Sequence, residues 1–364
     1  MIKVVHIIPN LSTGGAERFV VDLVNEGVRN NWDCNLILFE KSNNFFINEL
    51  DQKVKIHILE KKRGFDILFF FKIFSLLKKI KPNIVQTHLS AFNYMALTFM
   101  LSSYKFYHTI HSLPSKEYKS SLGKNLRLLF FKVLKKCTPI SISPKVDQEA
   151  RSLYGEGVKM IFNGRSMPNL TAQAVDIESY FDSLRMQGYK IFLNIGSLKE
   201  AKNHANLINA VKEVNTLGNY KVKLIILGGN KNSDEYNSVN VLADKNIELM
   251  GSVTNPQDYL AHTDFFILPS LWEGMPISLI ESFALGKVSL GTDVGGISYM
   301  IRSGVNGFLI DGTNVDDIKS AIENILILDT DILKEISENA RSAFDQKYSI
   351  NKCYNAHNNC YQDA

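Results

Sequence analysis

The stretch KVVHIIPNLSTGGAERFVVDLVNEGV, residues 3–28, contains the pattern that decides the fold class. Its first six residues, Lys3–Ile8, are rich in valine and isoleucine and predict a buried strand. The apolar residues from Phe19 onward recur at helical spacing and predict a helix. A loop with Gly14 and Gly15 lies between the two. A strand, a glycine-containing loop and a helix in this order indicate an α/β fold with parallel strands and crossover helices.

The glycine-containing loop allows two interpretations. Gly14 and Gly15 have no Cβ, so backbone N–H groups there can approach a phosphate closely, and the following helix adds the positive end of its dipole. The same glycines would also suit a tight turn without a ligand. The loop does not match the G-x-G-x-x-G pattern, which counts against a dinucleotide-dependent dehydrogenase.

The alternation of short strands and longer helical segments continues along the whole chain of 364 residues, a length that favours two domains. In the first half the predicted strands are Lys3–Ile8, Asn35–Phe39, Val54–Leu59, Ile84–His88, Phe106–Ile110 and Pro139–Ser143. In the second half they are Lys190–Ile195, Val222–Leu227, Ile247–Met250, Phe265–Pro269, Val288–Gly291 and Phe308–Ile310. The polar stretch Asn163–Gly188 between the two sets predicts an interdomain connection followed by a helix.

Composition indicates an ordinary globular protein, with 45% hydrophobic and 21% charged residues. The four cysteines form no CxxC pair and have no histidine at zinc-ligand spacing, so we expect neither a metal site nor a disulfide framework. The opening residues MIKVVHIIPN lack the features of a signal peptide, and no apolar run approaches the roughly 18 residues of a membrane span. These features predict a cytoplasmic protein.

The charge is unevenly distributed along the chain. Residues 1–165 contain 25 lysines and arginines against 13 acidic residues, whereas residues 166–364 contain 16 against 24. The excess of basic residues suggests that the first half of the chain faces a polyanion, either a membrane surface or a nucleic acid. No nucleic-acid recognition motif accompanies the charge, so we expect no nucleic-acid partner.

Two helical segments of the first half, residues 65–81 and 123–137, are rich in Lys, Leu and Phe. On a helical wheel of the second, one face carries Lys124, Arg127, Lys132 and Lys135 with Leu128 and Phe131, and the opposite face carries Leu126, Phe130, Val133 and Leu134. Cations mixed with apolar side chains suit an anionic membrane surface. Helices that bury one face and expose the other to solvent would show a similar pattern.

The second half places charged residues in loops that follow strands. Lys202 lies at the expected entrance of a helix that begins near Asn203, where a cation beside free N–H groups could hold a diphosphate. In SLWEGMPISLIE, residues 270–281, Glu273 falls in a loop, Pro276 suits the first turn of a helix, and Glu281 lies on that helix. Carboxylates bind vicinal hydroxyls strongly. Each of the three charges could instead be a solvated surface group.

Several segments together resemble glycosyltransferase family 4, the retaining enzymes of the GT-B fold, and in particular bacterial surface-polysaccharide glycosyltransferases. They are GGAER at 14–18, HTIHS at 108–112, IFNG at 161–164, GSLKEAKNH at 196–204 and PSLWEGMPISLIE at 269–281. The resemblance implies two doubly wound Rossmann-like domains that face each other across a cleft. Residues 1–165 would be the acceptor-side domain, 166–345 the donor-binding domain, and 346–364 a helical segment that packs back toward the N-terminal domain.

The resemblance also implies roles for individual residues. Lys202 would bind the donor diphosphate, Glu273 the hydroxyls of the donor sugar, and Glu281 those of the ribose. His111 would lie against the donor sugar, so the implied catalytic residues are His111, Lys202 and Glu273. The remaining implied donor-binding residues are Gly14, Gly15, Asn163, Ser197, Asn203, Gly274, Met275 and Pro276, and Ser143 matches a position that lines the cleft.

Two positions depart from the pattern of many family members. Ser197 stands where many members carry an arginine that contacts the phosphates. Phosphate binding would then depend more on Lys202, on the amides of Gly295 and Gly296, or on another cation. Tyr299 stands where many have an acidic residue, which implies different surroundings for the donor sugar.

The implied activity is the retaining transfer of a hexose from a UDP- or GDP-sugar to a glycan or lipid-linked sugar, with neither a metal nor a cofactor. Together with the basic first half, this predicts a cytoplasmic enzyme attached peripherally to the anionic inner face of the cell membrane. Two other classes remain open. A nucleotide-sugar epimerase of the same architecture would need no separate acceptor, and an idle GT-B partner subunit would bind the donor without turning it over.

Overall fold

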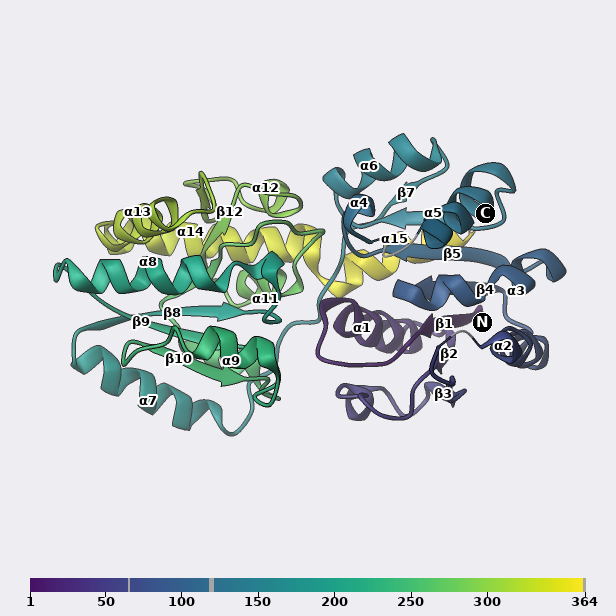
Figure 1. Ribbon diagram of the computed structural model, residues 1–364, viewed down its shortest axis with the longest axis horizontal. Helices are drawn as coiled ribbons and strands as arrows, with labels where there is room; N and C mark the ends of the chain where they lie inside the picture. The colour runs from purple at the N-terminus through teal and green to yellow at the C-terminus, as the bar shows by residue number, and fades with distance from the viewer. Residues whose placement is uncertain (65, 118–120, 363–364) are drawn as a thin grey trace. The chain divides into compact units, whose positions relative to one another are not determined.

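The computed structural model describes residues 1–64, 66–117 and 121–362 (Figure 1). The chain divides into two compact units: unit 1 comprises Met1–Ser166 and Ile350–Ala364, and unit 2 comprises Met167–Ser349. Each unit is an α/β structure built on a parallel sheet with helices against it, which confirms the predicted fold class of two Rossmann-like units.

Seven strands in the described part of unit 1 form one parallel sheet in the order β3-β2-β1-β4-β5-β6-β7. Their bounds are β1 Lys3–Ile8, β2 Asp33–Leu38, β3 Lys55–Ile58, β4 Ile84–His88, β5 Lys105–Ile110, β6 Thr138–Ser141 and β7 Lys159–Met160. The chain winds outward from β1 to β3 and then returns to the other side of β1 as β4. Ligands of open parallel sheets bind at such a switch point, beyond the carboxyl ends of the strands.

Six α-helices and one single turn lie in the described part of unit 1. They are α1 Gly15–Arg29, α2 Ile67–Ile80, α3 Ala96–Leu101, α5 Ser121–Arg127, α6 Pro144–Tyr154 and α15 Ile350–Gln362, with a single turn, α4, at Pro114–Glu117. The last helix, α15, drawn in yellow, belongs to unit 1 although it ends the chain (Figure 1). Its Tyr354 ring lies 4.8 Å from the ring of Trp32, and the Tyr354 hydroxyl donates to the Asn30 carbonyl at 3.4 Å.

Unit 2, all of whose residues are described, has a six-stranded parallel sheet in the order β10-β9-β8-β11-β12-β13. The strands are β8 Tyr189–Ile195, β9 Lys221–Leu227, β10 Ile247–Gly251, β11 Phe265–Leu268, β12 Val288–Thr292 and β13 Phe308–Ile310. Here the winding reverses between β8 and β11, so the loops after these two strands lie at the switch point.

The helices of unit 2 pack against both central and edge strands. They are α7 Ala174–Met186, α8 His204–Thr216, α9 Asp234–Asn240, α10 Pro256–His262, α11 Ile277–Ala284, α12 Ile297–Met300, α13 Val315–Leu326 and α14 Thr330–Ala343. Helices α8 and α13 bury Leu207, Ile208, Val211, Ile318 and Ile322 against the sheet. The helix predicted after the interdomain connection is α7.

All twelve predicted strands are present, with ends that agree within two residues, and Lys3–Ile8, Ile84–His88 and Phe308–Ile310 match to the residue. The additional strand, β7, consists of two exposed residues and therefore carries no hydrophobic pattern that would predict it. Of the helical segment predicted at 65–81, Phe65 lies outside the described residues, and the remainder is α2.

The helical wheel for residues 123–137 is wrong. Helix α5 passes into a π-helical turn, Leu128–Val133, and the Leu134 N–H donates to the Leu129 carbonyl five residues back. The wider turn shifts the angular phase of every later residue. Arg127 and Phe131, assigned to the face that carries the cations, are 4% and 5% exposed, whereas Val133, assigned to the opposite face, is 69% exposed.

No helix in the described part of the chain combines the length and the apolar composition that spanning a membrane requires.

Candidate functional site

The loops after β8 and β11 bring Lys202 and Glu273 into direct contact in unit 2. The Lys202 ammonium forms an ion pair with Oε1 of Glu273, and both side chains are largely buried, at 16% and 13% exposure. The Ser270 hydroxyl donates to the same Oε1 at 3.0 Å. The Leu271 N–H donates to the Ala201 carbonyl at 2.8 Å and ties the two loops together. Two residues 71 positions apart thus meet because their strands are neighbours at the switch point.

The glycine pair Gly295–Gly296 holds the Glu273 loop in place by close backbone contact. Gly295 has a φ of +53°, and a Cβ there would lie 2.0 Å from the Glu273 carbonyl oxygen. A Cβ on Gly296 would lie 2.0 Å from the Gly274 carbonyl oxygen. The Gly296 N–H donates to the Glu273 carbonyl at 3.1 Å. That amide is therefore engaged within the loop pair, and the expectation that it is open to a phosphate does not hold for this structure.

The loop between β8 and α8 positions Lys202 through its stem. A Cβ on Gly196 would lie 3.2 Å from Cε of Lys202, so the aliphatic part of this lysine lies across the glycine. Asn203 adopts a left-handed conformation with a φ of +56° and is the N-cap residue directly before α8, so the helix begins near Asn203 as predicted. Its side-chain amide donates to the Thr313 carbonyl at 2.7 Å. The side chain of Asn203 thus connects two loops, while Ser197 is partly exposed in the same β8–α8 loop.

Helix α11 places Glu281 inside unit 2. Pro276, predicted in the first turn, is the N-cap residue that directly precedes the helix. Glu281 is the fifth residue of α11 and is 8% exposed, and Met275 is 5% exposed. The interpretation of Glu281 as a solvated surface charge is therefore wrong. Tyr299, by contrast, lies on α12 and is 52% exposed.

The glycine-containing loop of unit 1 encloses a carboxylate of its own chain. Gly14 is the N-cap of α1 in an extended conformation, and a Cβ there would lie 2.0 Å from Oε2 of Glu17. The Ser12 hydroxyl donates to Oε1 of Glu17 at 3.1 Å. The Glu17 carboxylate therefore lies at the positive end of α1. Gly14 is needed for this close approach, and Gly15, the first residue of the helix, is exposed.

His111 follows β5 and is in contact with a second histidine. Its Nε2 lies 3.0 Å from Nδ1 of His88, the last residue of β4, and Nε2 of His88 lies 3.1 Å from Nδ1 of His6 on β1. Burial, and after it the nearby His357, lowers the pKa of His111 from its ordinary value of 6.5 to about 3. His6 and His88 are not among the predicted site residues. The available signal was the presence of histidine within otherwise apolar buried strands.

The two remaining predicted positions of unit 1 are buried. Asn163 is 3% exposed, and Ser143 is 1% exposed. The Ser143 hydroxyl accepts from the Val146 N–H at 3.4 Å and caps α6, which is a structural function.

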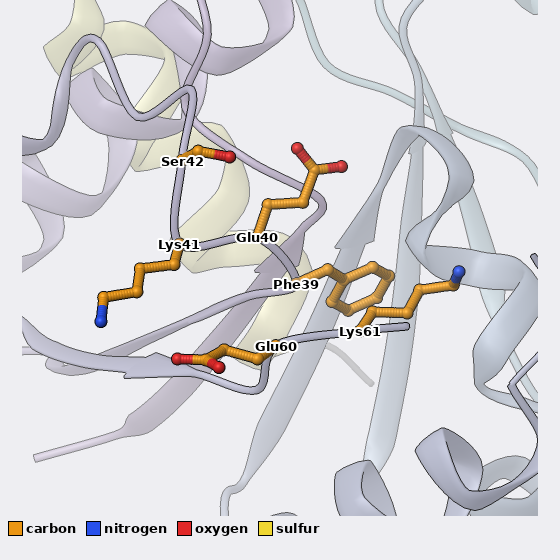
Figure 2. A pocket seen from close by; sticks show the side chains of 6 residues that line it. All are labelled: Phe39, Glu40, Lys41, Ser42, Glu60 and Lys61. Atoms are coloured by element: carbon orange, nitrogen blue, oxygen red, sulfur yellow. The ribbon is translucent and has the colours of Figure 1, made fainter. Parts of the chain in front are cut away.

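A shallow hollow of about 410 Å³ lies at the ends of β2 and β3 in unit 1. Figure 2 shows the six residues that line it, Phe39, Glu40, Lys41, Ser42, Glu60 and Lys61, with the Phe39 ring between the Glu40 and Lys61 side chains. None of the predicted site residues lines it. Its mixed charges and open form give no argument for a ligand of one class. Among the described residues, no group of three or more His, Cys, Asp or Glu side chains is arranged to hold a metal ion.

Comparison with protein families matches both parts of the chain. The model described as "Glycosyltransferase Family 4" matches residues 13–166, and the model described as "Glycosyl transferases group 1" matches residues 176–343. Together the two matches extend over most of both units.

Three curated relatives are similar at a low level of identity. An uncharacterised glycosyltransferase of Methanocaldococcus jannaschii is 28% identical over 61% of this chain and 58% of its own length. A UDP-Gal:α-D-GlcNAc-diphosphoundecaprenol α-1,3-galactosyltransferase of Escherichia coli is 27% identical over 79% of this chain and 77% of its own. A Campylobacter jejuni N-acetylgalactosaminyltransferase, named for a diphospho-undecaprenol-linked substrate, is 28% identical over 90% of each chain.

Among solved structures, the Anabaena protein HepE in complex with UDP and glucose has a similar fold, with a TM-score of 0.83. The similarity covers 100% of both chains at 17% sequence identity, which is evidence for the fold alone.

Proposed function

The chain is a glycosyltransferase of the GT-B fold that joins a family 4 domain to a group 1 domain, and from this premise we propose that it transfers a hexose from a UDP- or GDP-sugar to a lipid-linked sugar, with retention of the anomeric configuration. The reaction would serve surface polysaccharide assembly. The observation that carries the proposal is the Lys202–Glu273 pair at the switch point of unit 2, with Glu281 buried on the adjacent helix α11.

The chemistry of this group suits a nucleotide-sugar. The ammonium of Lys202 would bind the diphosphate and stabilise the negative charge that develops on the leaving nucleotide. The carboxylates of Glu273 and Glu281 would accept hydrogen bonds from hydroxyls of the sugar and of the ribose. Gly15 would offer its N–H at the start of α1 to a phosphate, and His111 would contact the donor sugar.

No metal takes part in the mechanism that we propose. The acceptor hydroxyl would attack from the face that the nucleotide leaves, and the departing β-phosphate oxygen would take its proton. Because Ser197 supplies no cation, Lys202 would carry most of the charge compensation. Turnover should then persist in EDTA, and a loss of turnover that Mg²⁺ restores would contradict this part of the proposal.

The acceptor class rests on relatives and on the surface of unit 1. Two of the relatives are named for substrates linked to diphospho-undecaprenol. Helix α2 exposes Ile67, Leu68 and Phe71 at 62%, 62% and 55%, beside the exposed lysines Lys72, Lys78 and Lys79. An apolar surface with cations suits binding to anionic lipid at the inner face of a cell membrane.

A transferase assay tests the donor half of the proposal. A panel of UDP- and GDP-sugars would be incubated with and without a polyprenyl-diphosphate-linked sugar, and free nucleotide and glycosylated lipid would be measured. We expect both products to depend on the acceptor. Lys202→Ala should lower kcat roughly 100-fold or more, whereas Lys334→Ala, which removes an exposed lysine of α14, should not. Interconversion of the donor without nucleotide release would indicate an epimerase and overturn the proposal.

Vesicle sedimentation tests the membrane half separately. The chain should sediment with vesicles that contain anionic lipid and much less with neutral ones. The double variant Leu68→Asp with Phe71→Asp should no longer sediment with anionic vesicles. The control variant Val175→Asp, at a 65% exposed position of α7 in unit 2, should sediment as the wild-type chain does. Equal sedimentation with neutral and anionic vesicles would contradict electrostatic binding through unit 1.

A further inference from the structure

Unit 1 contains a row of three histidine rings that leads from its interior to His111. Nδ1 of His6 lies 3.1 Å from Nε2 of His88, and Nδ1 of His88 lies 3.0 Å from Nε2 of His111. The ring centroids are 5.4 Å and 5.3 Å apart. His6 and His88 are fully buried, whereas His111 is partly exposed. Only the His111 end of the row can therefore reach a ligand.

Aromatic rings from the helices of unit 1 pack against the row. Phe19 of α1 packs edge-on against His88 and His111, with ring centroids 6.2 Å and 5.6 Å away. His357 of α15 packs against the same Phe19 ring and adds to burial in lowering the pKa of each histidine in the row, and its Nδ1 is 3.0 Å from the Cys353 carbonyl. Burial lowers the pKa of His6 to about 3 and holds that of His88 well below 6.5, the neighbouring histidines adding to the effect. All three rings are therefore neutral near pH 7.

Neutral rings in a row restrict each other's proton positions. A neutral imidazole carries one N–H, so in each contact one ring donates and the next accepts. Only two arrangements satisfy both contacts. In the first arrangement, His6 donates to His88 and His88 donates to His111, so the proton of His111 lies on Nδ1. In the second, His111 donates to His88 and His88 donates to His6, so the proton of His6 lies on Nε2.

The buried end of the row distinguishes the two arrangements. Nε2 of His6 is inaccessible to solvent and has no hydrogen-bond partner among the described residues. A proton on this nitrogen would be a buried N–H without an acceptor, which protein interiors avoid more strictly than an unfilled acceptor. The favoured arrangement starts from a proton on Nδ1 of His6. At the other end of the row, it places an N–H on Nδ1 of His111, for which the described residues provide no acceptor.

We propose that His88 and His6 are positioning residues that hold His111 in the Nδ1–H tautomer, so that His111 donates a hydrogen bond to an oxygen of the bound nucleotide-sugar. This inference rests on the proposed function for the identity of the ligand. The tautomer itself depends only on the row of rings. A fixed donor in a partly enclosed site stabilises charge on oxygen without reorganisation during the reaction.

The first test measures the tautomer without any substrate. The chain has eight histidines, and ¹⁵N labelling of histidine makes the nitrogens of all their rings visible by NMR. The signals that disappear in the His111→Gln variant are those of the two nitrogens of His111. We expect the wild-type ring to be neutral with its proton on Nδ1. A proton on Nε2 would overturn the proposal whatever the activity of the protein.

The second test compares two substitutions of nearly equal shape. His88→Asn retains an amide that can donate to Nε2 of His111, whereas His88→Leu offers no hydrogen bond. The Leu variant should lose the fixed tautomer and lower kcat roughly 10- to 100-fold with little change in KM for the donor, and the Asn variant should recover most of this loss. Equal kcat values for the two variants would indicate a purely structural role and overturn the proposal.

A buried histidine on the same sheet provides the matched control. His108 packs against Phe92 and Phe131, and its Nδ1 contacts the Thr87 hydroxyl at 2.9 Å, so it is not a member of the row. His108→Leu should lower stability and leave the His111 tautomer unchanged. If the wild-type chain releases nucleotide from no UDP- or GDP-sugar, the proposed function fails, and the tautomer measurement still decides the positioning role.

Discussion

At the scale of single residues, the contact between Lys202 and Glu273 joins the two groups that the proposed mechanism uses for different parts of the donor. In the structure they neutralise each other, and each is less than one-fifth exposed. In the proposed complex, a donor would replace this ion pair with contacts of its own. Its diphosphate would compete with Glu273 for the lysine, and its hydroxyls would compete with Lys202 for the carboxylate.

A double-mutant cycle measures this coupling. Lys202→Met and Glu273→Gln should each lower the free energy of unfolding by about 1–3 kcal/mol, because each leaves one largely buried charge without its partner. The double variant should lose less than the sum of the two. Urea unfolding of the four proteins provides the values. Strictly additive losses would show that the ion pair contributes nothing to the folded state.

The backbone of the Glu273 loop offers a second test at this scale. Gly295→Ala should be destabilised by about 2–4 kcal/mol, because it combines a positive φ with a Cβ placed on the Glu273 carbonyl oxygen. Gly304→Ala is the matched control, since Gly304 has a φ of +75° and nothing within 4 Å of the added Cβ. It should cost only about 1 kcal/mol. Thermal unfolding measures the loss of stability in each variant. Equal losses would show that the contact between the added Cβ and the Glu273 carbonyl has no effect.

At the scale of elements, the C-terminal helix α15 completes the core of unit 1. Tyr361 is 1% exposed, its ring lies 5.1 Å from that of Tyr107 and 5.3 Å from that of Trp32, and its hydroxyl donates to Oε1 of Gln86. The same helix contributes His357, which packs against Phe19 beside the row of histidines. An element far from β4 and β5 in sequence thus supports their side chains Gln86 and Tyr107.

Two substitutions separate the apolar and polar parts of this contact. Tyr361→Ala should lower the free energy of unfolding by about 3–5 kcal/mol through the cavity it leaves, and Tyr361→Phe by about 1–3 kcal/mol because Gln86 loses its buried donor. The chain has two tryptophans, Trp32 in unit 1 and Trp272 in unit 2. The loss of stability should appear as an earlier unfolding transition in the fluorescence of Trp32, measured in a chain that also carries Trp272→Phe. An unchanged Trp32 transition would show that α15 does not stabilise unit 1.

At the scale of the whole molecule, the buried neutral histidines are concentrated in unit 1. Burial lowers the pKa values of six histidines in unit 1, His6, His57, His88, His108, His111 and His357, and His204 is the one described histidine of unit 2 with such a shift. Each of these groups has a lower pKa in the folded than in the unfolded chain, so the unfolded state binds more protons in acid. Stability is therefore lost as the pH falls below 6.5, the unfolded value.

The two units should respond differently to acid. Each such histidine costs roughly 1.4 kcal/mol per pH unit below its unfolded pKa until its folded pKa is reached, which for His6 and His111 is about 3. Unit 1, with six such histidines against one in unit 2, should unfold at a higher pH than unit 2. Two single-tryptophan variants separate the transitions. Trp32 fluorescence in a Trp272→Phe chain reports the unfolding of unit 1, and Trp272 fluorescence in a Trp32→Phe chain reports that of unit 2. Unfolding of unit 2 at the higher pH would contradict the prediction.

Local patterns in the sequence determined the strands, the longer helices and the loops that carry the proposed donor-binding residues. Buried parallel strands such as Lys3–Ile8 and Ile84–His88 are short apolar runs, and the loop positions of Lys202 and Glu273 and the helix position of Glu281 agree with the prediction. The roles of these three residues came from the family resemblance and remain a prediction. The π-helical turn at Leu128–Val133 was not predictable, because the helical wheel assumes a constant rotation per residue and cannot represent a change of helix type.

Only the tertiary structure decided which side chains meet. His6 and His88 are 82 positions apart and His88 and His111 are 23 apart, and they form a row because β1, β4 and β5 are neighbours in the sheet. Strand order depends on how the crossover helices pack, which no local pattern encodes. The sequence therefore determined the residue types available for the chemistry. The order of the strands decided that His111 is in contact with His88, which is in contact with His6 in turn, and that Lys202 is paired with Glu273.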